Sequence, residues 1–246
     1  DLIIEKTGTE SFRVINELSV DSYLYGVVGS EMWASWPLDA LMAQAVAART
    51  YVLHRSILKK DKPYHVYSDV RSQMYKGVAG ETITVRKAVD LTKGQVLSYG
   101  KKIFAPFYSS CCGGETLSVK EVFGEPEILP LSGTSCPYCK LARKPKNFNW
   151  TAERSQAEVE MGFARLKKYG TFKHIKSITP IPAANRHHLK SLRVEANGKS
   201  YTVSAVDLRT ALSLKSTAIK SIEKKGQRFY FKGIGHGHAV GMCQWG

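Results

Sequence analysis

The sequence lacks any long apolar run. No stretch reaches 18 consecutive apolar residues, so none has the length of a transmembrane helix. The chain also opens at Asp1 without a methionine or a signal-like segment. We therefore expect a processed product, which leaves room for an N-terminal signal or membrane anchor before Asp1. A hydrophobic content of 43% and a charged content of 23% are typical of a soluble globular protein.

Acidic residues are scarce. The chain has 21 of them against 36 lysines and arginines, which gives a formal net charge of +15. Such an excess predicts an anionic partner: nucleic acid, an acidic membrane surface or an anionic cell-wall polymer. No motif that reads DNA or RNA accompanies the charge, so a nucleic-acid partner is not expected. The basic residues form separate short clusters at 59–62, 101–102, 143–146, 167–168 and 224–225.

Cysteines are few and odd in number, so at least one of the five stays outside any disulfide within the chain. Cys136 and Cys139 form a CxxC pair, which is a common half-site for tetrahedral zinc. With Cys111 and Cys112 they supply four thiols, and we predict a structural zinc site there. Adjacent cysteines rarely bind one metal together. In a variant of this site, only one of Cys111 and Cys112 therefore joins Cys136 and Cys139, and a histidine is the fourth ligand. A disulfide between the two loops is the alternative and suits an exported protein.

Helical and strand-like patterns alternate along the chain. We expect an α+β fold of mixed helices and antiparallel hairpins, with two lobes around a cleft. We treat 1–246 as one unit, with a smaller lobe at about 140–225 inserted before a closing segment at 228–246. Helices are expected at 21–32, 37–58, 81–92, 149–169 and 206–214, and strands within 3–20, 95–110, 175–181, 189–196, 199–205 and 228–235.

Glu31 is the strongest candidate for catalysis. It follows Leu24, Val27 and Val28 at helical spacing, which places it on an apolar helix face. That face, two nearby tryptophans and the helix C-terminus all favour a protonated carboxyl. A carboxylic acid that is neutral near pH 7 can act as a general acid. The alternative is a solvated glutamate at a helix end.

Five sequence blocks resemble the SpoIID stage II sporulation protein family. The first and last, YLYGVVGSEMWASWPLDALMAQAVAARTY and GHGHAVGMCQWG, are the most specific, and the others are SQMYKG, YSSCCGGET and SVDLRTALSLKSTAIK. The blocks lie in the family's order over most of the chain. The resemblance implies an extracytoplasmic SpoIID-like catalytic unit. The family includes lytic transglycosylases that cleave peptide-stripped peptidoglycan glycan, amidase-enhancer relatives, and members reported to bind zinc.

The resemblance also implies functions for individual residues. Glu31 falls on the family's catalytic glutamate, and substrate-binding residues are expected at Arg49, Gln73, Tyr75, His238 and Gln244. Three positions depart from the family pattern, with Ala239 in place of glycine, Cys243 in place of serine and Ser109 in place of histidine.

One carboxylate is enough for the implied reaction. A two-carboxylate glycosidase needs a second acid, and the chain offers Asp21, Asp39 and Asp69 only by proximity in the sequence. We therefore predict that Glu31 first protonates the glycosidic oxygen and then deprotonates the muramoyl 6-hydroxyl, which leaves a 1,6-anhydro end. Expected partners are glycan strands and a cell-wall amidase that strips stem peptides. The competing hypothesis is a non-catalytic peptidoglycan-binding module of the amidase-enhancer type.

Overall fold

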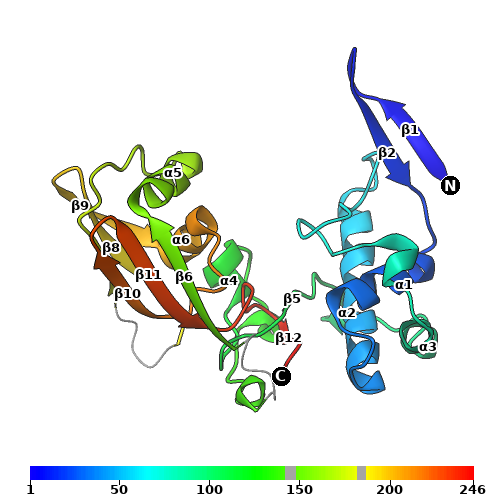
Figure 1. Cartoon of the computed structure of the whole chain (residues 1–246). Helices are drawn as coiled ribbons and strands as arrows, with labels where there is room; N and C mark the ends of the chain where they lie inside the picture. Colours follow the sequence, from blue (N-terminus) through cyan, green and yellow to red (C-terminus); the bar gives the residue numbers. More distant parts are fainter. Residues whose placement is uncertain (142–147, 182–186) are drawn as a thin grey trace. The chain divides into compact units, whose positions relative to one another are not determined.

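The computed structural model describes residues 1–141, 148–181 and 187–246, so the basic cluster predicted at 143–146 lies outside the described residues. The chain divides into two compact units, Asp1–Phe107 and Tyr108–Gly246 (Figure 1). Both contain helices and antiparallel strand pairs, which confirms the α+β prediction. The cleft and the lobe at about 140–225 stay predictions.

The first unit is mainly helical. Its buried core consists of apolar side chains from three helices, chiefly Leu24, Val27, Leu41, Val85 and Val89. No helix in the described part of the chain is both long and apolar enough to cross a membrane. The elements are hairpin β1 (Leu2–Lys6) and β2 (Phe12–Asn16), α1 (Val20–Glu31), α2 (Leu38–Leu58), the 3-10 helix η1 (Gly77–Gly80), α3 (Ile83–Leu91), and hairpin β3 (Ser98–Tyr99) and β4 (Lys102–Ile103).

Helix α1 is fixed at both ends by local chemistry. Ser19 caps its N-terminus, where its hydroxyl accepts the N–H of Ser22 at 3.2 Å. Near the other end, a Cβ atom on Gly29 would lie 1.9 Å from the carbonyl oxygen of Gly80. Only a glycine permits this approach of α1 to η1. The last turn of α1, which ends at Glu31, is therefore packed against the chain that follows residue 76.

The second unit is mainly β structure over a core rich in phenylalanine. Phe163, Phe172, Phe229 and Phe231 are all fully buried in it. One antiparallel sheet has the order β10 (Ile219–Lys225), β11 (Arg228–Ile234), β6 (Asn149–Ser155), and the other has β7 (Ser177–Ile181), β8 (Ser191–Ala196), β9 (Lys199–Ser204). The helices are α4 (Val119–Phe123), α5 (Gln156–Leu166), α6 (Ala205–Leu212), and the 3-10 turns η2 (Leu129–Leu131) and η3 (Tyr138–Lys140).

Two local predictions in this unit were wrong, and one was confirmed. The helix expected from residue 149 begins only at Gln156, because residues 149–155 pair with β11 and Ser155 starts α5 with a capping box to Glu158. Strand β10 was missed because its lysine-rich sequence is mostly exposed and shows no clean alternation. The strands expected at 189–196 and 199–205 are β8 and β9, which the Asn197-Gly198 turn joins.

A short parallel pair returns the end of the chain to the start of the second unit. Strand β5 (Tyr108–Ser109) pairs with β12 (Met242–Cys243). Next to it, the backbone N–H of Cys111 donates to the carbonyl of His236 at 2.9 Å, and the N–H of His236 donates back at 2.7 Å. The predicted GHGHAVGMCQWG block therefore lies along the cysteine pair.

Candidate active site and thiol cluster

Glu31 is the last residue of α1 and is half-buried. Its Oε1 accepts the backbone N–H of Met74 at 2.7 Å. This hydrogen bond joins the end of α1 to the SQMYKG block and fixes the direction of the carboxyl group. Trp33 and Trp36 follow it in an edge-to-face pair with centroids 5.7 Å apart. The helix end predicted for Glu31 is confirmed, and its catalytic function stays a prediction.

The residues on both sides of Met74 form a layer beside Glu31. Gln73 is 1% exposed, and its Oε1 accepts the hydroxyl of Tyr23 at 3.3 Å. The ring of Tyr75 stacks on that of Tyr23, with centroids 5.3 Å apart and planes inclined by 25°. Burial raises the pKa of Tyr23, and Tyr51, Glu31 and Tyr75 add to this shift. Tyr23 was not predicted from the sequence, although its i, i+4 spacing to Val27 already places it on the core side of the helix.

Arg49 is 3% exposed and points to the end of α3. Its guanidinium donates to the carbonyls of Thr92 at 2.8 Å, Val89 at 3.0 Å and Gln95 at 3.3 Å, and to Asp21 at 3.2 Å. These bonds tie α3 and the start of α1 to α2. Arg49 thus has a structural function in this unit, and its assignment to substrate binding stays a prediction.

The other carboxylates named from the sequence have partners or positions of their own. Asp21 pairs with Arg49, and Asp69 forms a bidentate pair with Arg71. Hydrogen bonds from the Arg71 side chain and backbone lower the pKa of Asp69 to about 2. Asp39 lies in the first turn of α2, where a negative charge complements the helix dipole.

His238 and Gln244 belong to the second unit. The Nδ1 atom of His238 accepts the backbone N–H of Val240 at 3.0 Å, and its ring meets Phe123 edge-on at 5.1 Å. Burial, together with the charge of Arg209, lowers the pKa of His238 to about 4. The backbone N–H of Gln244 donates to the carbonyl of Ser109 at 3.0 Å. Their predicted part in binding substrate beside Glu31 stays a prediction.

Four cysteines of the second unit form a cluster that could hold a metal ion. The Sγ atoms of Cys112, Cys136, Cys139 and Cys243 all lie within 4.8 Å of one another, and the first three residues are buried. Cys111, which we had expected among the ligands, is not in this group, and Cys243 takes the fourth place. The 3.7 Å between the Sγ atoms of Cys112 and Cys139 matches the separation of about 3.8 Å that tetrahedral geometry gives for Zn–S bonds of about 2.3 Å.

The chemistry of the cluster suits a cation. All five cysteines are free thiols, and 3.7 Å is far beyond the S–S bond length of about 2.05 Å. Hydrogen bonds to Cys243 raise the pKa of Cys111 and Cys112, while those same bonds lower the pKa of Cys243. The thiols thus compete for one negative charge. A bound cation removes this competition because it stabilises each ligand as a thiolate.

The cluster is closely packed by the last described residue. A Cβ atom on Gly246 would lie 2.5 Å from the Sγ of Cys136 and 3.4 Å from that of Cys243. The backbone N–H of Cys112 donates to the Sγ of Cys243 at 3.3 Å. Gly246 and the backbone N–H of Cys112 thus lie directly against the sulfur atoms, and a side chain at position 246 would displace the thiols.

Comparison with known proteins follows the same division of the chain. Residues 8–99 match the family model of the stage II sporulation protein, SpoIID. This stretch is a SpoIID-family domain. Residues 140–241 match a second model, a domain of unknown function, DUF8618. The SpoIID match contains Glu31, Arg49, Gln73 and Tyr75, whereas the DUF8618 match contains His238 and ends before Cys243 and Gln244.

Relatives of this chain match most of its length. An uncharacterized protein of Brachyspira hyodysenteriae is 35% identical over 240 residues, which cover 96% of this chain and 62% of that protein. The amidase enhancer of Bacillus subtilis is 29% identical over 91% of this chain and 36% of its own length. Stage II sporulation protein D of Bacillus subtilis is 27% identical over 99% of this chain and 71% of its own length. The chain thus spans less than two thirds of the first two relatives.

The departures from the family pattern fit their surroundings in the second unit. Ser109 is 7% exposed, and a Cβ atom on Gly237 would lie 2.6 Å from its Cβ. Ala239 adopts a left-handed φ of 60°, where glycine is the usual residue. Cys243 joins the thiol cluster. The signal that could have identified Cys243 as a ligand is its position in a glycine-rich block, combined with the rarity of adjacent cysteines on one metal.

Proposed function

We propose that the chain is a lytic transglycosylase. It cleaves the bond between N-acetylmuramic acid and N-acetylglucosamine in peptide-stripped peptidoglycan glycan and leaves 1,6-anhydro-N-acetylmuramic acid ends. The observation that supports this most is the carboxyl group of Glu31, which Met74 holds at 2.7 Å beside the layer of Tyr23, Gln73 and Tyr75. The SpoIID-family domain at residues 8–99 agrees with it.

Glu31 performs both proton transfers. Because the N–H of Met74 binds Oε1, we assign the mobile proton to Oε2. This proton goes to the glycosidic oxygen as the bond to the anomeric carbon breaks. The carboxylate then takes the proton of the muramoyl 6-hydroxyl, whose oxygen bonds to the same anomeric carbon. The attack is intramolecular, so its nucleophile is already in place and no water has to be positioned.

The neighbouring acids support a mechanism with a single carboxyl group. A retaining glycosidase of the two-carboxylate type needs its second carboxylate about 5 Å from the first. In the first unit, Asp21 and Asp69 are held in ion pairs with Arg49 and Arg71. Arg49 then acts as a positioning residue that keeps α1 in place through Asp21. Gln73, Tyr75, His238 and Gln244 are assigned to the glycan.

The thiol cluster has a structural function in this proposal. Cys112, Cys136, Cys139 and Cys243 would bind zinc, which supplies four metal–sulfur bonds between three separate stretches of chain. These stretches carry His238 and Gln244, so the cluster fixes the segment to which substrate binding is assigned. The proton transfers need only the chain's own residues.

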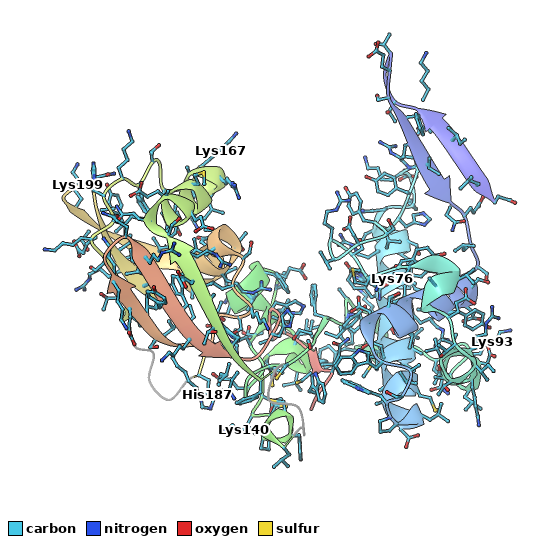
Figure 2. All side chains as sticks on the ribbon, viewed as in Figure 1. Lys76, Lys93, Lys140, Lys167, His187 and Lys199 are labelled. Atoms are coloured by element: carbon cyan, nitrogen blue, oxygen red, sulfur yellow. The ribbon has the colours of Figure 1, made fainter. Side chains whose placement is uncertain are left out.

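Surface charge and family names suggest where the protein works. Exposed lysines are spread over both units, as Lys76 and Lys93 in the first and Lys140, Lys167 and Lys199 in the second illustrate (Figure 2). A net charge of +15 suits an anionic wall polymer. We therefore assign the chain to the extracytoplasmic cell envelope, in wall remodelling during sporulation or division, with an amidase that strips stem peptides as its partner.

The decisive experiment is digestion of purified peptide-stripped glycan, with anhydromuramoyl products measured by mass spectrometry. We expect products from the wild type and from the control Glu10→Gln, which changes an exposed glutamate of the same unit. Glu31→Gln keeps an acceptor for Met74 but has no proton to give, so we expect product formation to fall by about a thousandfold. No anhydro product from the wild type, or equal yield from Glu31→Gln, contradicts the proposal.

The amidase-enhancer relative supports a second candidate function. That Bacillus subtilis protein is similar over 91% of this chain. A non-catalytic module would bind the glycan and help an amidase reach its peptides. This second function predicts that the protein co-sediments with peptidoglycan and does not cleave it. The Glu31→Gln protein should then behave in the same way as the wild type.

A further inference from the structure

Arg209 is half-buried on α6 and forms no ion pair with any residue of 1–141, 148–181 or 187–246. Asp207, the acid of the same helix, is held by Lys168 and Tyr169 instead. Burial lowers the pKa of the Arg209 guanidinium, and a desolvated charge costs free energy unless an anion offsets it. Five other arginines have a carboxylate partner: Arg13, Arg49, Arg71, Arg86 and Arg228.

One carbonyl oxygen joins Arg209 to the closing segment of the chain. The carbonyl of Lys215 accepts the Nε of Arg209 at 3.4 Å and the backbone N–H of Gly237 at 2.8 Å. The preceding residue, His236, is held in turn by the carbonyl of Cys111, which accepts its N–H at 2.7 Å. The two terminal nitrogens of the guanidinium have no partner among the described residues. We call Arg209, Lys215 and His236 the Arg209 cluster.

The Arg209 cluster carries positive charge that no neighbouring acid offsets. Burial lowers the pKa of His236, and the charges of Lys215 and Arg209 lower it as well. Burial and the charge of Arg209 act in the same way on His238. In the part of the chain that the structure describes, no carboxylate contributes to the pKa shift of Arg209, His236 or His238. Lys215 and His236 are exposed, so an anion in solution can reach the cluster.

The three side chains of the cluster suit a phosphoryl group better than a carboxylate. A guanidinium presents paired N–H donors in one plane, which match two oxygens of a phosphate. A phosphate monoester carries a charge of about −1.5 to −2 near pH 7 and three acceptor oxygens. These oxygens suffice for a guanidinium, an ammonium and an imidazole together, whereas a carboxylate has a single charge and one oxygen fewer.

We propose that the Arg209 cluster binds a phosphoryl group, either as free phosphate or as the terminal phosphate of a monoester. The guanidinium of Arg209 binds two of its oxygens, and Lys215 and His236 contact it from the exposed side. The bound anion would also join α6 to the closing segment. This inference goes beyond the proposed function, because peptide-stripped glycan has no phosphoryl group. Either can therefore fail without the other.

The test is calorimetric titration of the whole chain with inorganic phosphate, at roughly 0.15 M salt to screen non-specific attraction. Arg209→Gln should weaken binding by at least about tenfold, because it removes the charge-assisted hydrogen bonds. Lys215→Gln should weaken it by about threefold, because an exposed cation contributes less. This second variant keeps the backbone carbonyl that binds Arg209 and Gly237, so we expect it to fold as the wild type does.

Arg193→Gln and Lys199→Gln are the matched controls, because each removes the same charge from an exposed residue of the same unit outside the cluster. Their affinity for phosphate should equal that of the wild type. An equal loss in the control and cluster variants would show that net charge alone attracts phosphate, and it overturns the inference. A wild type that binds no phosphate, or that binds acetate as tightly as phosphate, overturns it too.

Glycerol 3-phosphate distinguishes the two sources of the phosphoryl group. If it binds as tightly as inorganic phosphate and depends equally on Arg209, the site accepts a monoester. If only inorganic phosphate binds, the ligand is the free anion. Hydrogen exchange of the Arg209→Gln protein checks its folding. Should this variant unfold, the Lys215→Gln protein decides, and an unchanged affinity for phosphate in it rejects the site.

Discussion

The two units of this chain are stabilised by different kinds of contact. In the first, apolar helix faces pack together, and glycines such as Gly29 permit backbone contact between elements close in the sequence. In the second, strands distant in sequence pair with each other, and four thiols gather where loops meet. The first unit thus places Glu31 by helix packing together with the hydrogen bond from Met74. The second has long irregular stretches, which a metal bound to sulfur would hold more firmly than their own packing does.

Removal of one thiol from the cluster should have the largest effect on this difference between the two units. Cys112→Ser should abolish stoichiometric zinc and destabilise the second unit by at least about 4 kcal/mol, because metal binding contributes directly to folding. Metal analysis and hydrogen exchange resolved by segment would measure both effects. The first unit should keep its protection.

Cys111→Ser is the matched control, since Cys111 lies beside the cluster but outside it. It should keep the zinc. Zinc loss from the Cys111 variant, or its retention by the Cys112 variant, would show that the ligand set is wrong.

A pair of glycine substitutions tests the packing of each unit separately. A Cβ atom would lie 1.9 Å from the carbonyl oxygen of Gly80 in Gly29→Ala, and 2.3 Å from that of Ala211 in Gly162→Ala. Each should destabilise its own unit by about 3 kcal/mol, because backbone cannot move aside as a side chain can. Denaturant unfolding followed by hydrogen exchange would assign each loss to its unit.

Gly8→Ala provides the comparison, because its new Cβ would meet only the hydroxyl of Ser11, at 2.7 Å. That side chain can rotate, so the loss should be small. If Gly29→Ala or Gly162→Ala lowered the stability of both units, the two units would not be independently packed.

The smallest expected effect is a pH dependence confined to the second unit. The folded-state pKa of His238 is about 4, below its ordinary value of about 6.5, because burial disfavours the charged ring. Between these values the unfolded chain binds a proton that the folded chain does not. Stability should therefore fall as the pH drops from 7 to 4, by about 2 kcal/mol once partial exposure is allowed for.

Comparison with His238→Gln isolates this contribution, because glutamine keeps an acceptor and does not titrate. The pH dependence of the unfolding free energy should be shallower in the variant over this range. Equal slopes in both proteins would remove His238 as the cause.

Features set by local sequence were predictable, and those set by distant contacts were not. The helix ending at Glu31 follows from the spacing of Leu24, Val27 and Val28, all of which are fully buried. The fourth thiol was assigned to Cys111 in place of Cys243, because Cys243 lies 131 residues from Cys112 and the pairing of β5 with β12 brings them together.

Arg49 shows the same limit within one unit. Its place on the opposite register from most of the apolar stripe of this helix indicates a need for a carboxylate or solvent, and Asp21 supplies the carboxylate. Its three carbonyl acceptors at the end of α3 could not be predicted, since they depend on how one helix crosses another. The Arg209 cluster is likewise formed by segments that no periodicity connects.

The thiol cluster also sets an order of events during synthesis. In a chain made from its N-terminus, Cys112, Cys136 and Cys139 are synthesised well before Cys243. Strand β5 likewise cannot pair until β12 has been synthesised. Closing so long a loop carries an entropic cost that the later contacts must offset. Until then the early thiols have an incomplete ligand set and are open to oxidation. Cys243, which follows Cys112 by 131 residues, therefore completes the cluster that the earlier cysteines begin.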